Sequence, residues 1–232
     1  MTRLLNGIVA FGSVLLLAVT LIGAGFAAVA IPDAATATLS RALSGCDQPK
    51  TPFTADELAS MAIAGKHYTF DDNDREKLDA AIAKANAATE ANGRTNALSR
   101  ESAARTLPAD AISHLDDVYR VASVAKPALV IVAVLCIAGL AHVAVRISRR
   151  ALGCTFMAGG GLVLATFCAL GAWAAIDFDG LFAAFHSLFF QAGTWTFPYD
   201  SLLITLYPTA FWMGMGGIWL AVTCGLSILA VL

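Results

Sequence analysis

Two histidines of this chain have sequence neighbours that favour acid–base chemistry. His114 precedes Asp117 by three residues, a spacing that puts both side chains on one face of a helix. A carboxylate near an imidazole selects its tautomer and raises its basicity. His186 lies in an aromatic segment, and the acids near it in the sequence are Asp177, Asp179 and Asp200. Such groups suffice for general acid–base catalysis on an ester, which contributes about 10²–10⁴-fold to a rate.

The sequence lacks the motifs of several other kinds of active site. No serine or cysteine lies in a nucleophile motif such as G-x-S-x-G, so no covalent acyl-enzyme is expected. No Cys/His spacing matches a zinc site, and the glycine-rich motifs that bind nucleotide phosphates are missing. The net charge of −2 comes without a block of Lys and Arg, which argues against nucleic acid. We therefore expect no metal, no nucleotide and no other cofactor.

The remaining histidines and the cysteines fit structural roles. His142 lies near the end of an apolar run, where a packing or headgroup contact is expected, and His67 is expected on the surface. Four of the five cysteines lie in apolar runs, where a free Cys behaves as a small hydrophobic residue. Cys46 alone lies in a polar segment. No intramolecular disulfide is predicted.

The composition places the chain among membrane proteins. Hydrophobic residues make up 58% and charged residues 14%, whereas soluble domains have roughly 25% charged residues. Four apolar runs are long enough to cross a bilayer. They predict transmembrane helices at residues 1–31, 125–147, 153–176 and 201–232. The predicted fold is therefore an all-α integral membrane protein.

Two processing signals compete with the first predicted transmembrane helix. The apolar run is longer than the core of a signal peptide, about 7–15 residues, so an uncleaved anchor is favoured over a signal peptide. Residues 43–46 read Leu-Ser-Gly-Cys, as in a lipoprotein-processing box. This second interpretation is disfavoured because Asp33 and Arg41 separate the box from the apolar run.

The polar residues between the first two runs predict a small, mainly helical cap. Thr54 and Glu57 form a capping-box pattern at the start of one helix. A stripe of apolar residues predicts a second helix over residues 74–91, ended by Asn-Gly. Residues 66–70 could form a short strand. A further helix begins near residue 108 and is expected to continue into the second span, with a kink at Pro127.

The basic residues predict how the chain is oriented in the membrane. They flank the first span and crowd the loop between the second and third spans, as Arg3, Arg146, Arg149 and Arg150. The positive-inside rule puts these residues and both chain termini in the cytoplasm. The cap, residues 32–124, and the loop of residues 177–200 then lie outside. His114 and His186 therefore belong to the same outer face, and residues 177–200 are the expected active-site loop.

Two stretches of the chain resemble the signatures of a known family. The first reads His114-x-x-Asp117-Val118. The second comprises Phe185-His186, Phe189-Phe190, Trp195-x-Phe197, Asp200-x-x-Leu203-Ile204 and Tyr207-Pro208. Both stretches are similar to those of the lipoprotein intramolecular transacylase family, whose members are bacterial membrane proteins with four spans and a large first outer segment.

The resemblance implies an acyltransferase of the bacterial cytoplasmic membrane. Its reaction moves an acyl chain from the sn-2 position of a diacylglyceryl-modified lipoprotein to the α-amine of the same N-terminal cysteine, and the product is a lyso-form lipoprotein. The implied partners are thus these lipoproteins and membrane lipid. No ATP is needed because ester-to-amide transfer is downhill, and no enzyme serine is needed because the substrate's own amine is the nucleophile.

The resemblance also implies roles for individual residues. His114 and His186 would be the catalytic pair, in which one deprotonates the amine and the other stabilises the oxyanion or protonates the leaving glyceryl oxygen. Asp117 would orient His114. The residues implied in substrate binding are Phe185, Phe189, Trp195, Asp200 and Tyr207. By residue type alone, the aromatic side chains among them also fit an interfacial belt.

Two other functions fit the same residues. A lipid-ester hydrolase could use the two histidines to activate water. A non-catalytic membrane assembly or sensor subunit could use them as interfacial contacts. A lipoprotein without a free α-amine separates transfer from hydrolysis, and replacement of the histidines by alanine separates both from the non-catalytic role.

Overall fold

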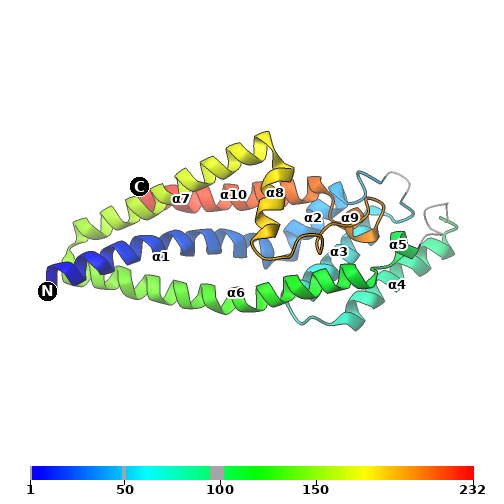
Figure 1. Cartoon of the computed structure of the whole chain (residues 1–232), viewed down its shortest axis with the longest axis horizontal. Coiled ribbons are helices and arrows are strands. Elements are labelled where there is room, and N and C mark those ends of the chain that lie inside the picture. The colour runs from blue at the N-terminus through cyan, green and yellow to red at the C-terminus, as the bar shows by residue number, and fades with distance from the viewer. Residues whose placement is uncertain (1, 49–50, 95–101) are drawn as a thin grey trace. The chain divides into compact units, whose positions relative to one another are not determined.

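The computed structural model describes residues 2–48, 51–94 and 102–232, and all regular structure within these ranges is helical. The helices are α1 (Thr2–Ala30), α2 (Asp33–Leu43), α3 (Ala55–Phe70), α4 (Arg75–Ala91), α5 (Ser102–Arg105), α6 (Ala109–His142), the π-helix η2 (Val143–Ile147), α7 (Arg149–Ile176), α8 (Phe178–Ser187), α9 (Leu202–Leu206) and α10 (Thr209–Val231) (Figure 1). The predicted all-α fold is thereby confirmed.

The chain divides into two compact units. The transmembrane unit comprises residues 1–31, 124–181 and 217–232, and the cap unit comprises residues 32–123 and 182–216. Four helical stretches of the described residues are long and apolar enough to cross a membrane, namely α1, α6 with η2, α7 and α10. The chain is thus a multi-pass membrane protein, as predicted.

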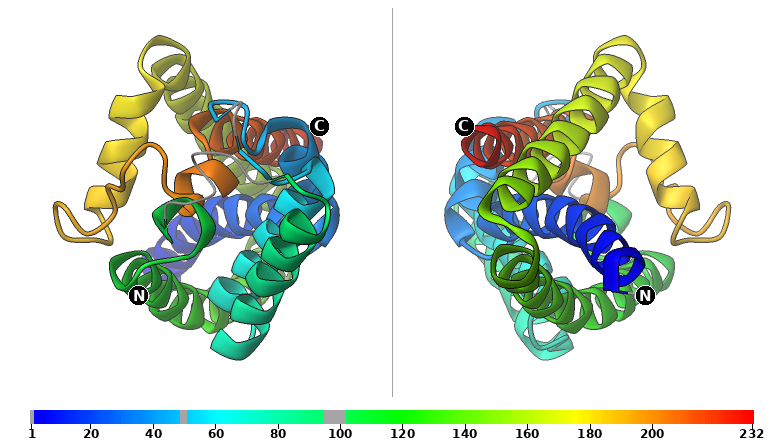
Figure 2. Two further views of the ribbon diagram at one scale, coloured as in Figure 1. Left: turned by 90° about the vertical axis from the view of Figure 1, so that its right-hand side faces the viewer. Right: turned by 90° about the vertical axis from the view of Figure 1, so that its left-hand side faces the viewer.

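Close packing of α1 against α7 organises the transmembrane unit (Figure 2). A Cβ atom on Gly159 would lie only 2.8 Å from Leu17 Cδ2, so the glycine lets the two helices approach closely. Trp219 of α10 packs edge-on against Phe167 of α7 at a centroid distance of 5.3 Å. Its indole N–H donates to the Ile22 carbonyl oxygen of α1 at 3.1 Å. These contacts join α1, α7 and α10 into one core.

Only part of α6 can cross the membrane. With η2 it forms a helical stretch of 39 residues, about 58 Å long at the helical rise, whereas the hydrocarbon layer is about 30 Å thick. The charged residues of its first half are Asp110, Asp116, Asp117, Arg120 and Lys126. The membrane-crossing part is therefore the apolar half after Lys126. His114, the sixth residue of α6, lies outside it.

The cap unit has its own hydrophobic core, built from α3, α4, the first turns of α6 and α9. Its fully buried side chains include Met61, Leu78, Leu202 and Leu206. The predicted capping box is confirmed, because the Glu57 N–H donates to Thr54 Oγ1 and the Thr54 N–H donates to Glu57 Oε2. The predicted second helix is confirmed as α4, which ends at Asn92 before Gly93, with a φ of 63°.

The strand predicted at residues 66–70 is wrong, because these residues form the end of α3. The residues of α3 that are buried fall at spacings of three and four, as in Leu58, Ala62, Lys66 and Thr69, which is the period of a helix face. The Thr69 hydroxyl donates to the Gly65 carbonyl oxygen at 3.0 Å. Burial of one helical face therefore outweighs the local preference of β-branched and aromatic residues for strands.

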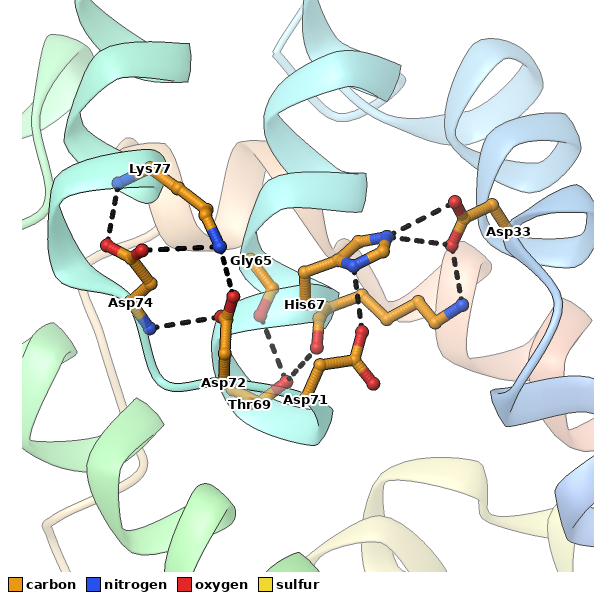
Figure 3. A network of polar contacts seen from close by, with 9 residues as sticks. Asp33, Gly65, His67, Thr69, Asp71, Asp72, Asp74 and Lys77 are labelled. Carbon is orange, nitrogen blue, oxygen red and sulfur yellow. Dashed lines mark hydrogen bonds and ion pairs between the residues drawn. The ribbon is translucent and has the colours of Figure 1, made fainter.

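A polar network ties the start of α2 to the end of α3 (Figure 3). Lys66 Nζ lies 2.7 Å from Asp33 Oδ1, and the His67 ring lies between Asp33 and Asp71, at 3.1 Å and 2.7 Å. The hydrogen bond from Lys66 holds the pKa of the Asp33 carboxyl below its usual range, against the opposing effect of burial. His67 is thus a partly exposed structural residue, as expected.

The fourth membrane helix is shorter than the predicted range of residues 201–232, since α10 begins at Thr209. Tyr207 leaves the helical region, with φ −128° and ψ 62°, because the residue before a proline is disfavoured in the α conformation. Before this break, α9 buries Leu202, Leu203 and Leu206 in the cap core. The segment from residue 201 to 207 therefore belongs to the cap unit.

Candidate functional site

His114 and His186 come together in the cap unit, although 71 residues separate them in the sequence. Their rings lie at a centroid distance of 6.2 Å with an angle of 28° between the planes. Each side chain is only 9% exposed. Both predicted histidines thus form one buried pair, too far apart to bond to each other directly, with a separation that suits a reacting group about 3 Å from each.

The two histidines are presented by different helices. His114 lies on α6, six residues after Pro108, whose carbonyl oxygen accepts the Ile112 N–H at 3.1 Å. His186 lies in the last turn of α8. Asp177 directly precedes this helix, and its Oδ1 accepts the Gly180 N–H at 2.8 Å. A carboxylate at a helix N-terminus satisfies a free N–H and favours the helix. Asp177, expected near the active site, therefore caps the start of α8, and no hydrogen bond joins it to a histidine within the described residues.

An aromatic shell encloses the pair. Phe190 meets His114 edge-on at 5.0 Å and Phe197 lies 5.6 Å from it. Phe182 and Trp195 cover His186 at 4.0 Å and 4.8 Å. All four rings come from α8 or from the irregular segment that follows it. The shell therefore explains why both imidazoles are shielded from water.

The tautomer of His186 is set by a backbone carbonyl. Its Nδ1 lies 2.9 Å from the Phe182 carbonyl oxygen, which can only accept a hydrogen bond. Nδ1 must then carry the proton, so the lone pair of the neutral ring is on Nε2. Burial lowers the pKa of His186 below its ordinary value, opposed by this hydrogen bond. At neutral pH the ring is thus an uncharged base with a free Nε2.

His114 is held neutral as well. Burial lowers its pKa to about 4, with a further contribution from His186 and an opposing one from Asp117. Its Nδ1 is buried, and within the described residues it has no hydrogen-bond partner. Buried polar atoms are nearly always paired, so this nitrogen is a candidate for a contact that only a substrate supplies.

Trp195 carries a second unpaired nitrogen in the same shell. Its Nε1 is buried and has no partner within the described part of the chain, although an indole N–H is an obligatory donor. The ring itself lies on His186. Two unpaired nitrogens beside one histidine pair are an arrangement expected of a binding site, because leaving such groups unpaired costs about 1–3 kcal/mol each.

No ion pair joins Asp117 to His114 within the described residues. Its Oδ1 accepts a hydrogen bond from Arg120 Nη1 at 2.5 Å, and no hydrogen bond joins it to His114 within the described residues. Its charge still acts on His114 through space, where it raises the pKa. The predicted carboxylate is thus an electrostatic neighbour of the pair whose direct partner is an arginine.

The predicted substrate-binding residues fall into two groups. The rings of Phe185 and Phe189 meet at a tilt, with a centroid distance of 5.3 Å, and are about half exposed, at 49% and 48%. Phe185 also meets His186 edge-on at 5.7 Å. Together with Trp195 they lie at the site. The hydroxyl of Tyr207 is already bonded, since it donates to the Ala62 carbonyl oxygen at 2.7 Å. Asp200 is half-buried, and no hydrogen bond or ion pair of its carboxylate is found among the described residues.

Phe182, Phe190 and Phe197 belong to the site but were not among the predicted substrate-binding residues. They lie in the same aromatic segment as His186, where they look like members of an interfacial belt. Only the fold shows that Phe190 and Phe197 face His114, which is far away in the sequence. The spacing of His186 to Phe182 and Phe190, four residues on either side, was the available signal for a shared face.

Comparison with known proteins gives a family match. The model of the family described as Lipoprotein intramolecular transacylase Lit matches residues 79–212, which is more than half of the chain and includes both histidines. The comparison with curated proteins found no match.

Solved structures give a match in fold. The membrane-integral lipoprotein intramolecular transacylase Lit from Bacillus cereus is similar with a TM-score of 0.74 at 17% identity, over 97% of this chain and 92% of that one. Two variants of the same protein, in which a histidine is replaced by alanine or by arginine, are similar with TM-scores of 0.68 at 16% identity. They cover 99% of this chain and 91% and 90% of their own.

Proposed function

Because the chain belongs to the lipoprotein intramolecular transacylase family, we propose that it moves the sn-2 acyl chain of a diacylglyceryl-modified lipoprotein to the N-terminal cysteine amine of the same molecule. The product is a lyso-form lipoprotein. The observation that carries this proposal is the buried, uncharged pair of His114 and His186 inside its aromatic shell. Such a pair can move protons beside an acyl chain without a metal, nucleotide or enzyme nucleophile.

We assign the general base to His186. The α-amine of a peptide has a pKa near 8, so it must lose a proton as it attacks the ester carbonyl. Nε2 of His186 has a free lone pair, because Nδ1 is committed to the Phe182 carbonyl oxygen. The nitrogen–carbon bond forms and the carbon–oxygen bond of the ester breaks. His186 then returns the proton to the leaving glyceryl oxygen, as one histidine does in other acyl transfers.

His114 and Trp195 are the proposed donors to the oxyanion. Negative charge develops on the carbonyl oxygen when the amine adds, and preorganised donors in a water-excluded site stabilise it. His114 is uncharged at neutral pH, so one of its nitrogens carries a proton that can be donated. Trp195 has a buried N–H without a partner. Asp117, paired with Arg120, would act on His114 only through its charge.

The exposed rings of Phe185 and Phe189 are the proposed contact with the acyl chains. They are half exposed beside His186, so an acyl chain would bury apolar surface there at about 25 cal/mol per Å². Tyr207 is not included, because its hydroxyl is already bonded within the cap core. Asp200 keeps its predicted substrate contact, since its half-buried carboxylate has no partner in the described part of the chain and could meet the ammonium form of the amine.

Mass spectrometry of a reporter lipoprotein tests the reaction. A lipoprotein-processing bacterium that makes this chain should convert the N-terminal lipopeptide to the N-acyl, S-monoacylglyceryl form, and His114→Ala or His186→Ala should abolish the conversion. His67→Gln is the matched control, a partly exposed histidine of the same unit, and should be active. Conversion by both alanine variants at the wild-type rate would overturn the assignment.

A blocked substrate separates transfer from hydrolysis. A lipopeptide whose α-amine is acetylated lacks the nucleophile, so a transacylase leaves it unchanged, whereas a lipid-ester hydrolase still releases fatty acid. Free fatty acid from this substrate at the rate of the normal reaction would replace the proposed function by the hydrolase.

The proposed orientation puts the cap unit outside and both termini in the cytoplasm. Arg146, Arg149 and Arg150 support it through the positive-inside rule. Cys46 of the cap unit is exposed and provides the test. A membrane-impermeant maleimide added to spheroplasts should label the wild-type chain at Cys46 and should not label the Cys46→Ser variant. If the maleimide labels the wild type and Cys46→Ser equally in spheroplasts, and labels Cys46 only after lysis, the orientation is the reverse of the proposed one.

A further inference from the structure

The arginines of the two units differ in whether they form ion pairs. The described arginines of the cap unit all pair with a carboxylate, in Arg41–Asp56, Arg75–Asp79, Arg94–Glu57, Arg105–Glu90 and Arg120–Asp117. The arginines of the transmembrane unit have no ion pair within the described residues, and they are Arg3, Arg146, Arg149 and Arg150. The transmembrane unit therefore carries positive charge that the described part of the chain does not neutralise.

The acids of the transmembrane unit are too distant to neutralise this charge. They are Asp177 and Asp179. Asp177 follows Arg150 by 27 positions along α7, or about 40 Å at the helical rise. The Debye length is about 8 Å at physiological ionic strength. Three arginines within five positions, Arg146 to Arg150, thus call for an anion from outside the chain.

A groove of about 480 Å³ lies beside Arg150, where α1 meets α7. Its wall on α1 consists of Ala10, Phe11 and Val14, and its wall on α7 consists of Ala151, Cys154 and Thr155. The Thr155 hydroxyl is already satisfied by the Ala151 carbonyl oxygen at 3.0 Å. Ser148 and Arg150 line one end. The groove therefore has one cationic, polar end and otherwise apolar walls.

The position of this groove along the helices matches the profile of a phospholipid. Arginines that flank a membrane span lie in the headgroup layer, and the walls begin within about one turn of Arg150, on the hydrocarbon side. Phe11 is 67% exposed, so it presents its ring to an acyl chain. A zwitterionic headgroup would also bring an ammonium group, and no aspartate or glutamate of the transmembrane unit lies at this end of α7 to meet it.

We propose that this groove binds an anionic phospholipid of the surrounding leaflet, with the phosphate on Arg150 and Ser148 and an acyl chain against Phe11 and Val14. Basic pockets between transmembrane helices recognise anionic headgroups in this way. The site is separate from the histidine pair, so it holds or fails independently of the proposed reaction.

Native mass spectrometry of the purified full-length chain tests this site. The protein is titrated with phosphatidylglycerol and, separately, with phosphatidylcholine of the same acyl chains. One phosphatidylglycerol should bind in preference to phosphatidylcholine. Arg150→Gln should weaken phosphatidylglycerol binding about fivefold, the effect of one basic residue next to an anionic lipid. Equal binding of the two lipids would overturn the proposal.

Two variants make the test specific to the groove. Arg149→Gln is the matched control, because this neighbouring arginine of α7 does not line the groove, and it should bind like the wild type. Ala10→Leu fills the groove without a change in charge and should also weaken binding. If Arg149→Gln and Arg150→Gln weaken binding equally, while Ala10→Leu has no effect, the attraction is a diffuse surface effect and the site is refuted.

Discussion

Replacement of Trp195 by phenylalanine should separate catalysis from stability in one substitution. The indole N–H is buried without a partner in the described part of the chain, while the ring covers His186 at 4.8 Å. Phenylalanine keeps an aromatic ring over the histidine and removes the N–H. If this N–H binds the oxyanion of the reaction, Trp195→Phe loses one donor that acts in the transition state.

Trp195→Phe should lower kcat and leave the Tm unchanged or raise it. Loss of one oxyanion donor lowers kcat about 10²–10³-fold, or about 2.7–4 kcal/mol of transition-state stabilisation. The folded state loses no hydrogen bond. Because an unsatisfied buried donor costs about 1–3 kcal/mol, its removal should leave the Tm unchanged or raise it. A merely structural tryptophan would show the reverse pattern, with a lower Tm and a nearly normal kcat.

The assay measures single-turnover acyl transfer on a synthetic diacylglyceryl lipopeptide, together with thermal unfolding in the same detergent. Trp219→Phe is the matched control, because its N–H donates to the Ile22 carbonyl oxygen; it should lose about 1 kcal/mol of stability and keep its kcat. The shape of the pH profile should be the same for Trp195→Phe and the wild type, since an indole does not titrate. A kcat for Trp195→Phe within about threefold of the wild type would refute the reasoning on the donor.

Acid should destabilise the protein through His114. Burial lowers the pKa of His114 to about 4 from 6.5, so between pH 4 and 6.5 the unfolded chain binds more protons than the folded one. The stability from His114 is therefore full above pH 6.5 and falls toward pH 4. His114→Asn should reduce this dependence of the Tm on pH in thermal scans. Tyr207→Phe should lower stability by about 1 kcal/mol, because the Ala62 carbonyl oxygen loses its donor, with acyl transfer unchanged in the lipopeptide assay. Lys66→Met should lower the free energy of unfolding by about 1.5–3 kcal/mol, since Asp33 loses its charged partner at 2.7 Å. If the double variant Lys66→Met/Asp33→Asn loses as much stability as the two single variants added together, the two residues are not coupled and the prediction is contradicted.

Local signals in the sequence predict most of the helices. The capping box of Thr54 and Glu57 and the Asn92-Gly93 end of α4 are short-range features, and both were correctly predicted. The wrong strand at residues 66–70 contains Tyr68 and Thr69, which favour strands locally, but their burial in α3 depends on other helices of the cap. The local preferences of these residues do not show their packing against residues far away in the sequence.

The candidate site was predictable in its residues more than in its contacts. The predicted orientation in the membrane and the family resemblance both put His114 and His186 on one face, and the fold brings their ring centroids to 6.2 Å from each other. The arginine partner of Asp117 depends on side-chain geometry within one helix. The hydroxyl of Tyr207 reaches a carbonyl 145 residues away, a contact that no motif encodes.

The aromatic shell bears on how the acyl group partitions between two nucleophiles. Phe190 and Phe197 enclose the imidazole of His114, and the histidine pair would serve water as readily as an amine. Which product forms is then decided by which nucleophile reaches the carbonyl, and an apolar enclosure favours a tethered amine over free water. If the histidine pair is catalytic, the rings around it would decide between acyl transfer and hydrolysis. Polar substitutions at Phe190 or Phe197 would then shift the activity toward hydrolysis.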